Sequence, residues 1–100
     1  MIETFSFERQ DWAETSPGIR QKGFESDGHR FRLVEYAVDA RHEEWCARGH
    51  LGYVLEGTIE FEMPDQKILV KTGEAFHVAE GTPHRARNAA AIPSRFFLAD

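Results

Sequence analysis

The chain has 100 residues, of which 41% are hydrophobic and 29% are charged, and its formal net charge at pH 7 is −5. This composition is typical of a folded domain and excludes a disordered chain, and the length allows one domain over residues 1–100 with one core. No apolar run approaches the roughly 18 residues that a membrane helix needs. An acidic chain without a basic cluster also argues against nucleic acid. We therefore expect neither a membrane nor a nucleic acid as partner.

The chain has a single cysteine, Cys46, and its first residues show no basic stretch followed by an apolar one. One cysteine excludes an internal disulfide framework and is typical of a reducing compartment. The missing signal-peptide pattern points the same way. We therefore expect a cytoplasmic protein.

Short apolar stretches separated by glycine and proline run along the chain, which is the pattern of an all-β domain. Eight stretches are predicted to form strands, in chain order residues 5–7, 19–24, 30–38, 51–55, 58–63, 67–71, 75–78 and 95–98. The clearest is residues 58–63, where Ile59, Phe61 and Met63 alternate with polar residues. Residues 39–48 are the best window for a helix, but they lack an apolar stripe, so no long helix is expected.

About eight strands in so short a chain need an arrangement that protects the sheet edges, because exposed edges pair with other chains. A closed barrel or a double-sheet jelly roll meets this need. Residues 2–7 also alternate in polarity, so an N-terminal strand within residues 1–12 is a candidate for pairing with a neighbouring copy.

Residues 73–88 carry a spaced set of glycine, histidine and asparagine. Gly73, Gly81, His84 and Asn88 fall in register with the pattern G-x5-P-x-G-x2-H-x3-N, and Ala79 stands at the position of its proline. This segment resembles the second sequence motif of the cupin family.

A second segment, residues 44–57, resembles the first cupin motif, G-x5-H-x-H-x3-4-E-x6-G. Gly57 matches its final glycine, and His50 stands at the position of its glutamate. With a three-residue spacer the two histidine positions hold Glu44 and Cys46, whereas a four-residue spacer gives residues 43 and 45, which make less sense as ligands. The position of the opening glycine holds Val38.

The resemblance, with a motif-like core over residues 44–88, implies a small cupin-type jelly-roll β-barrel of about eight strands. It also implies one metal ion held inside the barrel by three residues of the first motif and the histidine of the second. In this chain that set is Glu44, Cys46, His50 and His84. None of the three first-motif positions keeps its usual residue type, so the resemblance implies either a re-ligated site or a lost one.

The chemistry of these residues is compatible with a metal site. Residues 44, 46 and 50 share parity and would point to one side of a regular strand, unless Gly49 introduces a bulge. A carboxylate, a thiolate and two imidazoles are competent ligands for a divalent transition metal, with zinc as the first choice and iron, nickel or copper as alternatives.

Each candidate also has a simpler interpretation. Cys46 is compatible with a small buried hydrophobic residue and Glu44 with a solvated charge. His42, two residues before Glu44, is an alternative ligand or pocket residue. His77, on the predicted strand before Gly81, is a further candidate for the pocket wall.

Three functions are compatible with these patterns. The first is a metal-containing barrel that binds and transforms a compact organic substrate, since a metal ion can polarise a substrate oxygen or activate water or dioxygen. The second is a metal-free barrel that binds a small ligand or acts as a sensor, since a fold alone does not select a function. The third is an interaction protein that uses its N-terminal strand. The family resemblance also implies a homodimer.

Overall fold

The computed structural model describes residues 1–100 and consists of nine strands and one short helix. The bounds of the strands are β1 Ala13–Ser16, β2 Ile19–Ser26, β3 His29–Tyr36, β4 His50–Glu56, β5 Thr58–Met63, β6 Gln66–Lys71, β7 Ala75–Val78, β8 Arg85–Asn88 and β9 Ser94–Ala99. The helix is the 3-10 helix η1, Phe7–Arg9. No helix of the structure has the length and hydropathy that crossing a membrane requires.

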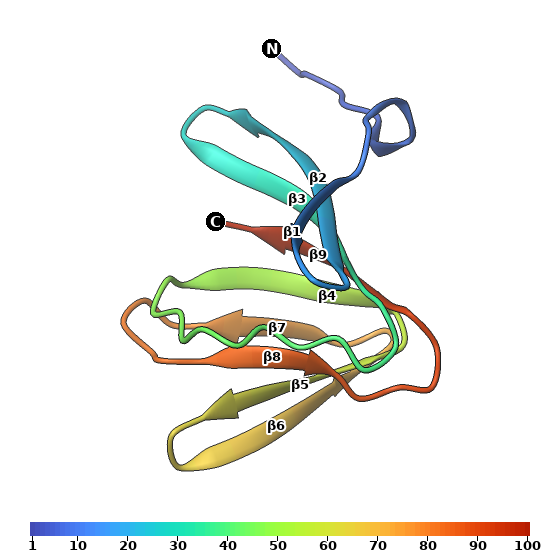
Figure 1. The fold of residues 1–100 in the computed structure, drawn as a ribbon. Coiled ribbons are helices and arrows are strands. Elements are labelled where there is room, and N and C mark those ends of the chain that lie inside the picture. Colours follow the sequence, from blue (N-terminus) through green and yellow to red (C-terminus); the bar gives the residue numbers. More distant parts are fainter.

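The strands form two sheets that face each other (Figure 1). The larger sheet has the order β1-β2-β3-β9-β4-β7, and the smaller has the order β6-β5-β8. Strands β6 and β7 are each the last strand of their sheet, so the two sheets do not close into a barrel. The prediction of an all-β jelly roll is therefore confirmed in its double-sheet form, and the closed-barrel alternative is wrong.

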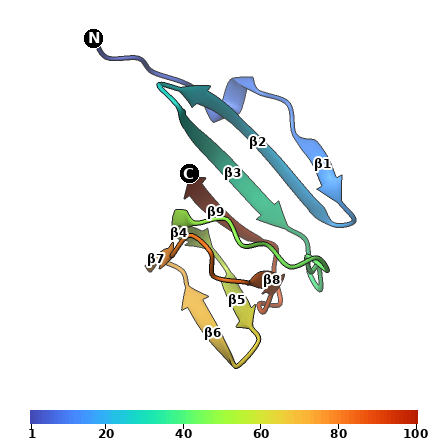
Figure 2. The ribbon, with the colours of Figure 1, turned by 90° about the vertical axis from the view of Figure 1, so that its left-hand side faces the viewer.

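Figure 2 shows the same molecule from the side, with the β1–β2–β3 hairpins at one end and the β5–β6 hairpin at the other. The core lies between the sheets, because alternating residues of each strand face inward. Val54 of β4 and Ile59 of β5 are fully buried, and Phe96 of β9 is 3% exposed. Strands β5 and β7 have the predicted bounds, whereas β1 and β8 were not predicted.

The N-terminal segment does not form the predicted strand. Residues 1–6 have no regular structure, and η1 occupies part of the predicted range. The ring of Phe5 stacks on that of Phe24 at a centroid distance of 3.8 Å, and the ring of Phe7 lies 5.3 Å from it. Aromatic packing on the outer face of the larger sheet thus replaces strand pairing, and the prediction of an N-terminal strand is wrong.

The turn between β4 and β5 requires glycine at residue 57. Gly57 has a φ of +79°, a conformation that other residues adopt only with strain. A β-carbon at this position would lie 2.1 Å from the hydroxyl oxygen of Ser94, which is itself fully buried. The glycine that ends the first motif is therefore needed for the close approach of the two sheets.

Candidate metal centre

The segment between β3 and β4 lies along the free edge of β8 and brings Cys46 opposite His84. The amide of Cys46 donates to the carbonyl of His84, the amide of His84 donates to the carbonyl of Cys46, and both bonds are 2.8 Å long. This reciprocal pair is an isolated antiparallel bridge. Directly opposed residues in an antiparallel pair place their side chains on the same face. Cys46 and His84 therefore point together into the space between the sheets.

His50 comes to the same place from the other sheet, because it is the first residue of β4. The parity argument, which held only for a regular strand over residues 44–50, therefore does not apply, since Cys46 forms an isolated bridge beside β8 and His50 belongs to the larger sheet. The ligand atoms of Cys46, His50 and His84 nevertheless lie within 4.8 Å of one another. The rings of the two histidines are nearly perpendicular, at 88°, with centroids 5.3 Å apart. Three of the four predicted ligands thus form one cluster, the Cys46/His50/His84 triad.

Hydrogen bonds fix the same tautomer in both histidines. Nδ1 of His84 lies 2.7 Å from the carbonyl oxygen of Thr82, and because a carbonyl can only accept, this nitrogen carries the proton. Nδ1 of His50 donates in the same way to Oδ2 of Asp100 at 3.0 Å. In the neutral form each ring therefore presents an unprotonated Nε2, which is the form that binds a metal. The donor set of the triad is two imidazole nitrogens and one thiol sulfur, so the residues present fit a divalent transition metal.

The charge state of the site follows from burial and from Asp100. Burial lowers the pKa of His50, although its hydrogen bond with Asp100 opposes this effect. The imidazole of His50 is therefore neutral near pH 7. Burial opposes ionisation of Asp100, but the hydrogen bond from Arg30 and the charge of Arg32 outweigh it and hold its pKa below the ordinary value. Asp100 thus remains a carboxylate that can accept from His50.

Asp100 is the centre of an ion cluster that sequence reasoning did not find. Its side chain is 3% exposed and lies 2.9 Å from Arg30, 3.0 Å from Arg32 and 3.4 Å from Arg48. The sequence of β3 contains an indication of this cluster. Arg30 and Arg32 share parity with two inward apolar residues, 34 and 36, and so face inward with them.

The remaining sequence candidates lie outside the triad. The side chain of Glu44 is exposed, and only its backbone carbonyl is engaged, at 2.9 Å from Nδ1 of His42. The structure therefore does not bring Glu44 to the other three ligands, because its residue lies on the outside of the loop. His42 is half-buried and lines the cavity beside the triad. His77 is exposed and lies at the rim of a separate groove.

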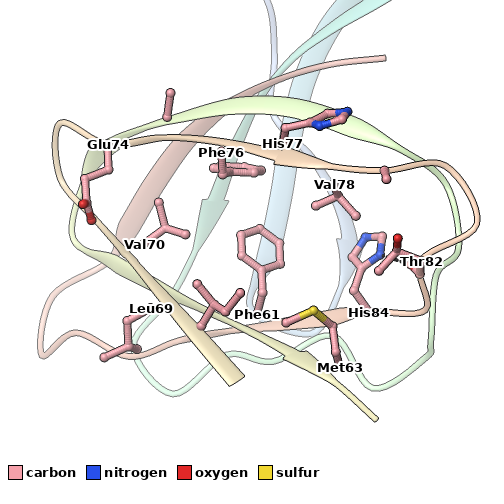
Figure 3. Close-up of a pocket in the computed structure, with 13 residues that line it drawn as sticks. Phe61, Met63, Leu69, Val70, Glu74, Phe76, His77, Val78, Thr82 and His84 are labelled. Atoms are coloured by element: carbon pink, nitrogen blue, oxygen red, sulfur yellow. Dashed lines mark hydrogen bonds between the residues drawn. The ribbon is translucent and has the colours of Figure 1, made fainter. Parts of the chain in front are cut away.

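Two hollows meet at His84 and Phe61, which line both. The first, with a volume of about 310 Å³, holds the triad and is lined on its other sides by β2, β3 and the residues around Arg48. The second, of about 470 Å³, is an apolar groove between β6 and β7. Figure 3 shows this groove with His84 and Thr82 at one end, Glu74 at the other and His77 pointing away from it. The first hollow is therefore the one in which a ligand would meet the triad, and we call it the triad cavity.

Comparison with solved structures places this arrangement in a known fold. KdgF from Halomonas sp. superposes with a TM-score of 0.83 at 22% sequence identity, covering 99% of this chain and 93% of that one. The cupin domain of Cnp3 from Schizosaccharomyces pombe has a TM-score of 0.80 at 15% identity, covering 96% and 71%. An RmlC-like cupin from Shewanella frigidimarina has a TM-score of 0.79 at 16% identity, covering 98% and 89%. At these identities the likeness shows the fold alone.

A search of curated proteins finds no match. A family model described as the cupin domain matches residues 29–99, which includes the whole triad and both resembling segments. The chain therefore belongs to the cupin family.

Proposed function

We propose that Cys46, His50 and His84 hold one divalent transition metal, and that a compact organic ligand binds beside it in the triad cavity. The observation that supports this most directly is the convergence of three ligand atoms within 4.8 Å from two different sheets. Both imidazoles also present Nε2 inward, held by Thr82 and Asp100. Free histidines that merely fill a core do not require such matched orientation.

Zinc is the first choice for this donor set, since it accepts both thiolate and imidazole ligands. Three protein ligands leave a coordination position for a substrate or water, whereas the four-ligand set with Glu44 would close it. When bound, such an ion polarises an oxygen of a neighbouring ligand or lowers the pKa of a water. Iron, nickel and copper remain alternatives, since selectivity depends on metal supply as well as on ligand type. A thiol ligand also suits the reducing cytoplasm in which we propose that the protein works.

Elemental analysis of untagged protein, purified without chelator, tests the metal site. We expect about one equivalent of a transition metal per chain. Removal of the metal with a chelator is expected to lower the melting temperature, because a ligand that binds only the folded state stabilises it. A protein that is consistently metal-free and equally stable in chelator would contradict the proposal. It would favour a metal-free ligand-binding or sensor module.

We also propose that the protein is a homodimer that uses the outer face of the larger sheet. Three apolar residues on one face of β4 are 43–58% exposed, namely Leu51, Tyr53 and Leu55. The rings of Phe31 and Phe97 lie next to them on the same face, 6.3 Å apart. Met1 and Ile2 are also exposed. A continuous apolar face of this kind is typical of a protein-protein interface.

Deletion of residues 1–10 tests the dimer. Because Phe5 and Phe7 cover Phe24 on this face, the deletion is expected to alter the interface and to convert dimer to monomer. Light scattering coupled to size-exclusion chromatography measures the mass of both proteins. A mass of one chain before and after the deletion would refute the proposed dimer.

A further inference from the structure

We infer that the ligand of the triad cavity is a compact carboxylate, held by the guanidinium groups of Arg30, Arg32 and Arg48 beside the metal ligands. The inference rests on the proposed function, since it names the substrate class of the same site. It is based on the positive charges that line the cavity, which are opposite in sign to the net charge of the chain.

The triad cavity is strongly cationic. Its lining includes Arg30, Arg32 and Arg48, together with Arg85, whose guanidinium points outward to Glu62, and it includes no aspartate or glutamate. The whole chain carries a net charge of −5, so this concentration of positive charge is local. A cavity lined by one sign of charge raises the local concentration of ligands of the opposite sign.

The internal ion pairs do not neutralise this charge. Arg85 is paired with Glu62, which lies outside the cavity lining, at 2.6 Å. The other three arginines share one carboxylate, that of Asp100. Three guanidinium groups thus share one side-chain carboxylate in their direct ion pairs. An anionic ligand would give them a second partner.

Hydrogen-bond donors are also left over in the cluster. A guanidinium has five N–H donors. Nη1 and Nη2 of Arg32 donate to Gln21 and Asp100, but its Nε is buried without a partner. The side chain of Arg48 is 54% exposed, and its Nε lies 3.4 Å from Oδ2 of Asp100. Because the Nε of Arg32 has no accessible surface, the donors open to a ligand are those of the partly exposed Arg48.

The arginine cluster is suited to binding a carboxylate. Arg30 binds the carboxylate of Asp100 with two parallel hydrogen bonds, from Nε at 2.9 Å and from Nη2 at 3.0 Å. This fork arrangement matches the spacing of carboxylate oxygens. The volume of about 310 Å³ limits the ligand to a small molecule. Tyr36, whose pKa burial raises to about 12, lines the same cavity as a protonated phenol and so adds no negative charge.

Matched acid and amide pairs test the inference by isothermal titration calorimetry. The probes are glycolate and glycolamide, succinate and succinamide, benzoate and benzamide, with inorganic phosphate as a fourth anion. Each is titrated into zinc-loaded protein and into protein stripped with chelator and desalted. We expect at least one acid to bind ~10-fold tighter than its amide in both forms, because charge-assisted bonds to arginine require the carboxylate.

Two variants separate the arginine cluster from general charge. Arg48→Gln is expected to lower the affinity for the acid ~10-fold while leaving the zinc content unchanged. Arg87→Gln is the matched control, since Arg87 pairs with Glu60 and does not line the triad cavity. Loss of acid binding in both variants, or in neither, would overturn the inference.

The remaining outcomes are equally decisive. Equal affinity for acid and amide, binding of phosphate in preference to every acid, or no binding of any probe would each overturn it. Binding of the acid only to the zinc-loaded form would show that the metal, and not the arginine cluster, binds the carboxylate, and would also overturn the inference. Absence of zinc with the acid preference intact would reject the metal site alone, so that the two failures are distinguishable.

Discussion

Replacement of Asn88 by alanine is expected to lower the free energy of unfolding by about 3–5 kcal/mol, because it leaves several buried backbone groups without partners. Asn88 is 3% exposed. Its amide nitrogen lies within 3.2 Å of the carbonyl oxygens of Tyr36, Ala37 and Ile92, and its side-chain oxygen accepts from the amide of Ala90 and the hydroxyl of Ser94. One side chain therefore joins the end of β3, the end of β8 and the start of β9.

Chemical denaturation monitored by tryptophan fluorescence measures the effect. Asn88→Asp is the informative second variant, since it keeps the acceptor oxygen and loses the two amide donors. It should also destabilise the fold. Gln66→Ala, at the exposed start of β6, is the control and should change the free energy of unfolding by less than ~0.5 kcal/mol. A loss below ~1 kcal/mol for Asn88→Ala would show that the network relaxes without cost.

The same network supports the candidate metal centre. The backbone amide of Asn88 donates to the carbonyl of Ala40 at 2.9 Å, and the amide of His42 donates to Ala86 at 2.9 Å. These bonds hold the segment before Cys46 along the edge of β8. The asparagine of the second motif is thus a structural residue, four positions after His84 of the triad, and it fixes the loop that carries Cys46.

The sequence predicted most strands because alternation of apolar and polar residues survives in them. Strand β8 was missed since Ala86 is its only hydrophobic residue. Its outward side chains instead pair with β5, where Arg85 contacts Glu62 and Arg87 contacts Glu60. Ion pairs between neighbouring strands do not produce a local pattern of apolar residues. Strand β8 could therefore be identified only in the three-dimensional structure.

Three of the four predicted metal ligands lie together, but the reason differs from the one expected, which was that residues of equal parity face the same side of a regular strand. That argument assumed one regular strand for residues 44, 46 and 50, whereas Cys46 forms an isolated bridge with His84 and His50 begins β4. Motif register predicted the three residues that lie together because it encodes the whole fold, while parity describes only one strand. Asp100 was missed because its role depends on Ala99 pairing with Leu51, a contact between residues far apart in the chain.

Substitutions in and around the triad are expected to separate ligands from positioning residues. Cys46→Ser and His50→Ala each remove one donor of the triad, so both should lower metal occupancy strongly and together. Glu44→Gln is expected to leave occupancy unchanged, because that side chain is exposed and lies outside the cluster. His77→Ala is the matched histidine control, since His77 is exposed at the rim of the groove. Equal loss in the control would indicate non-specific metal binding.

Asp100→Asn is expected to give an intermediate result, which distinguishes positioning from ligation. An asparagine can still accept from Nδ1 of His50, but it loses the charge that makes the imidazole a stronger ligand. We expect metal affinity to fall by ~10–100-fold, as for other residues that orient a ligand histidine. Competition with a chromophoric chelator measures this affinity for each variant.

A comparison of the metal affinities of the single and double variants tests whether Asp100 acts through His50. If Asp100 acts through His50, then combining Asp100→Asn with His50→Ala should cost no more than His50→Ala alone, because the residue that it orients is gone. Additive losses would instead show that Asp100 acts independently, through the arginines that it holds. Since Arg30, Arg32 and Arg48 share this carboxylate, the same double variant also reports whether the metal centre and the cationic cavity work as one site.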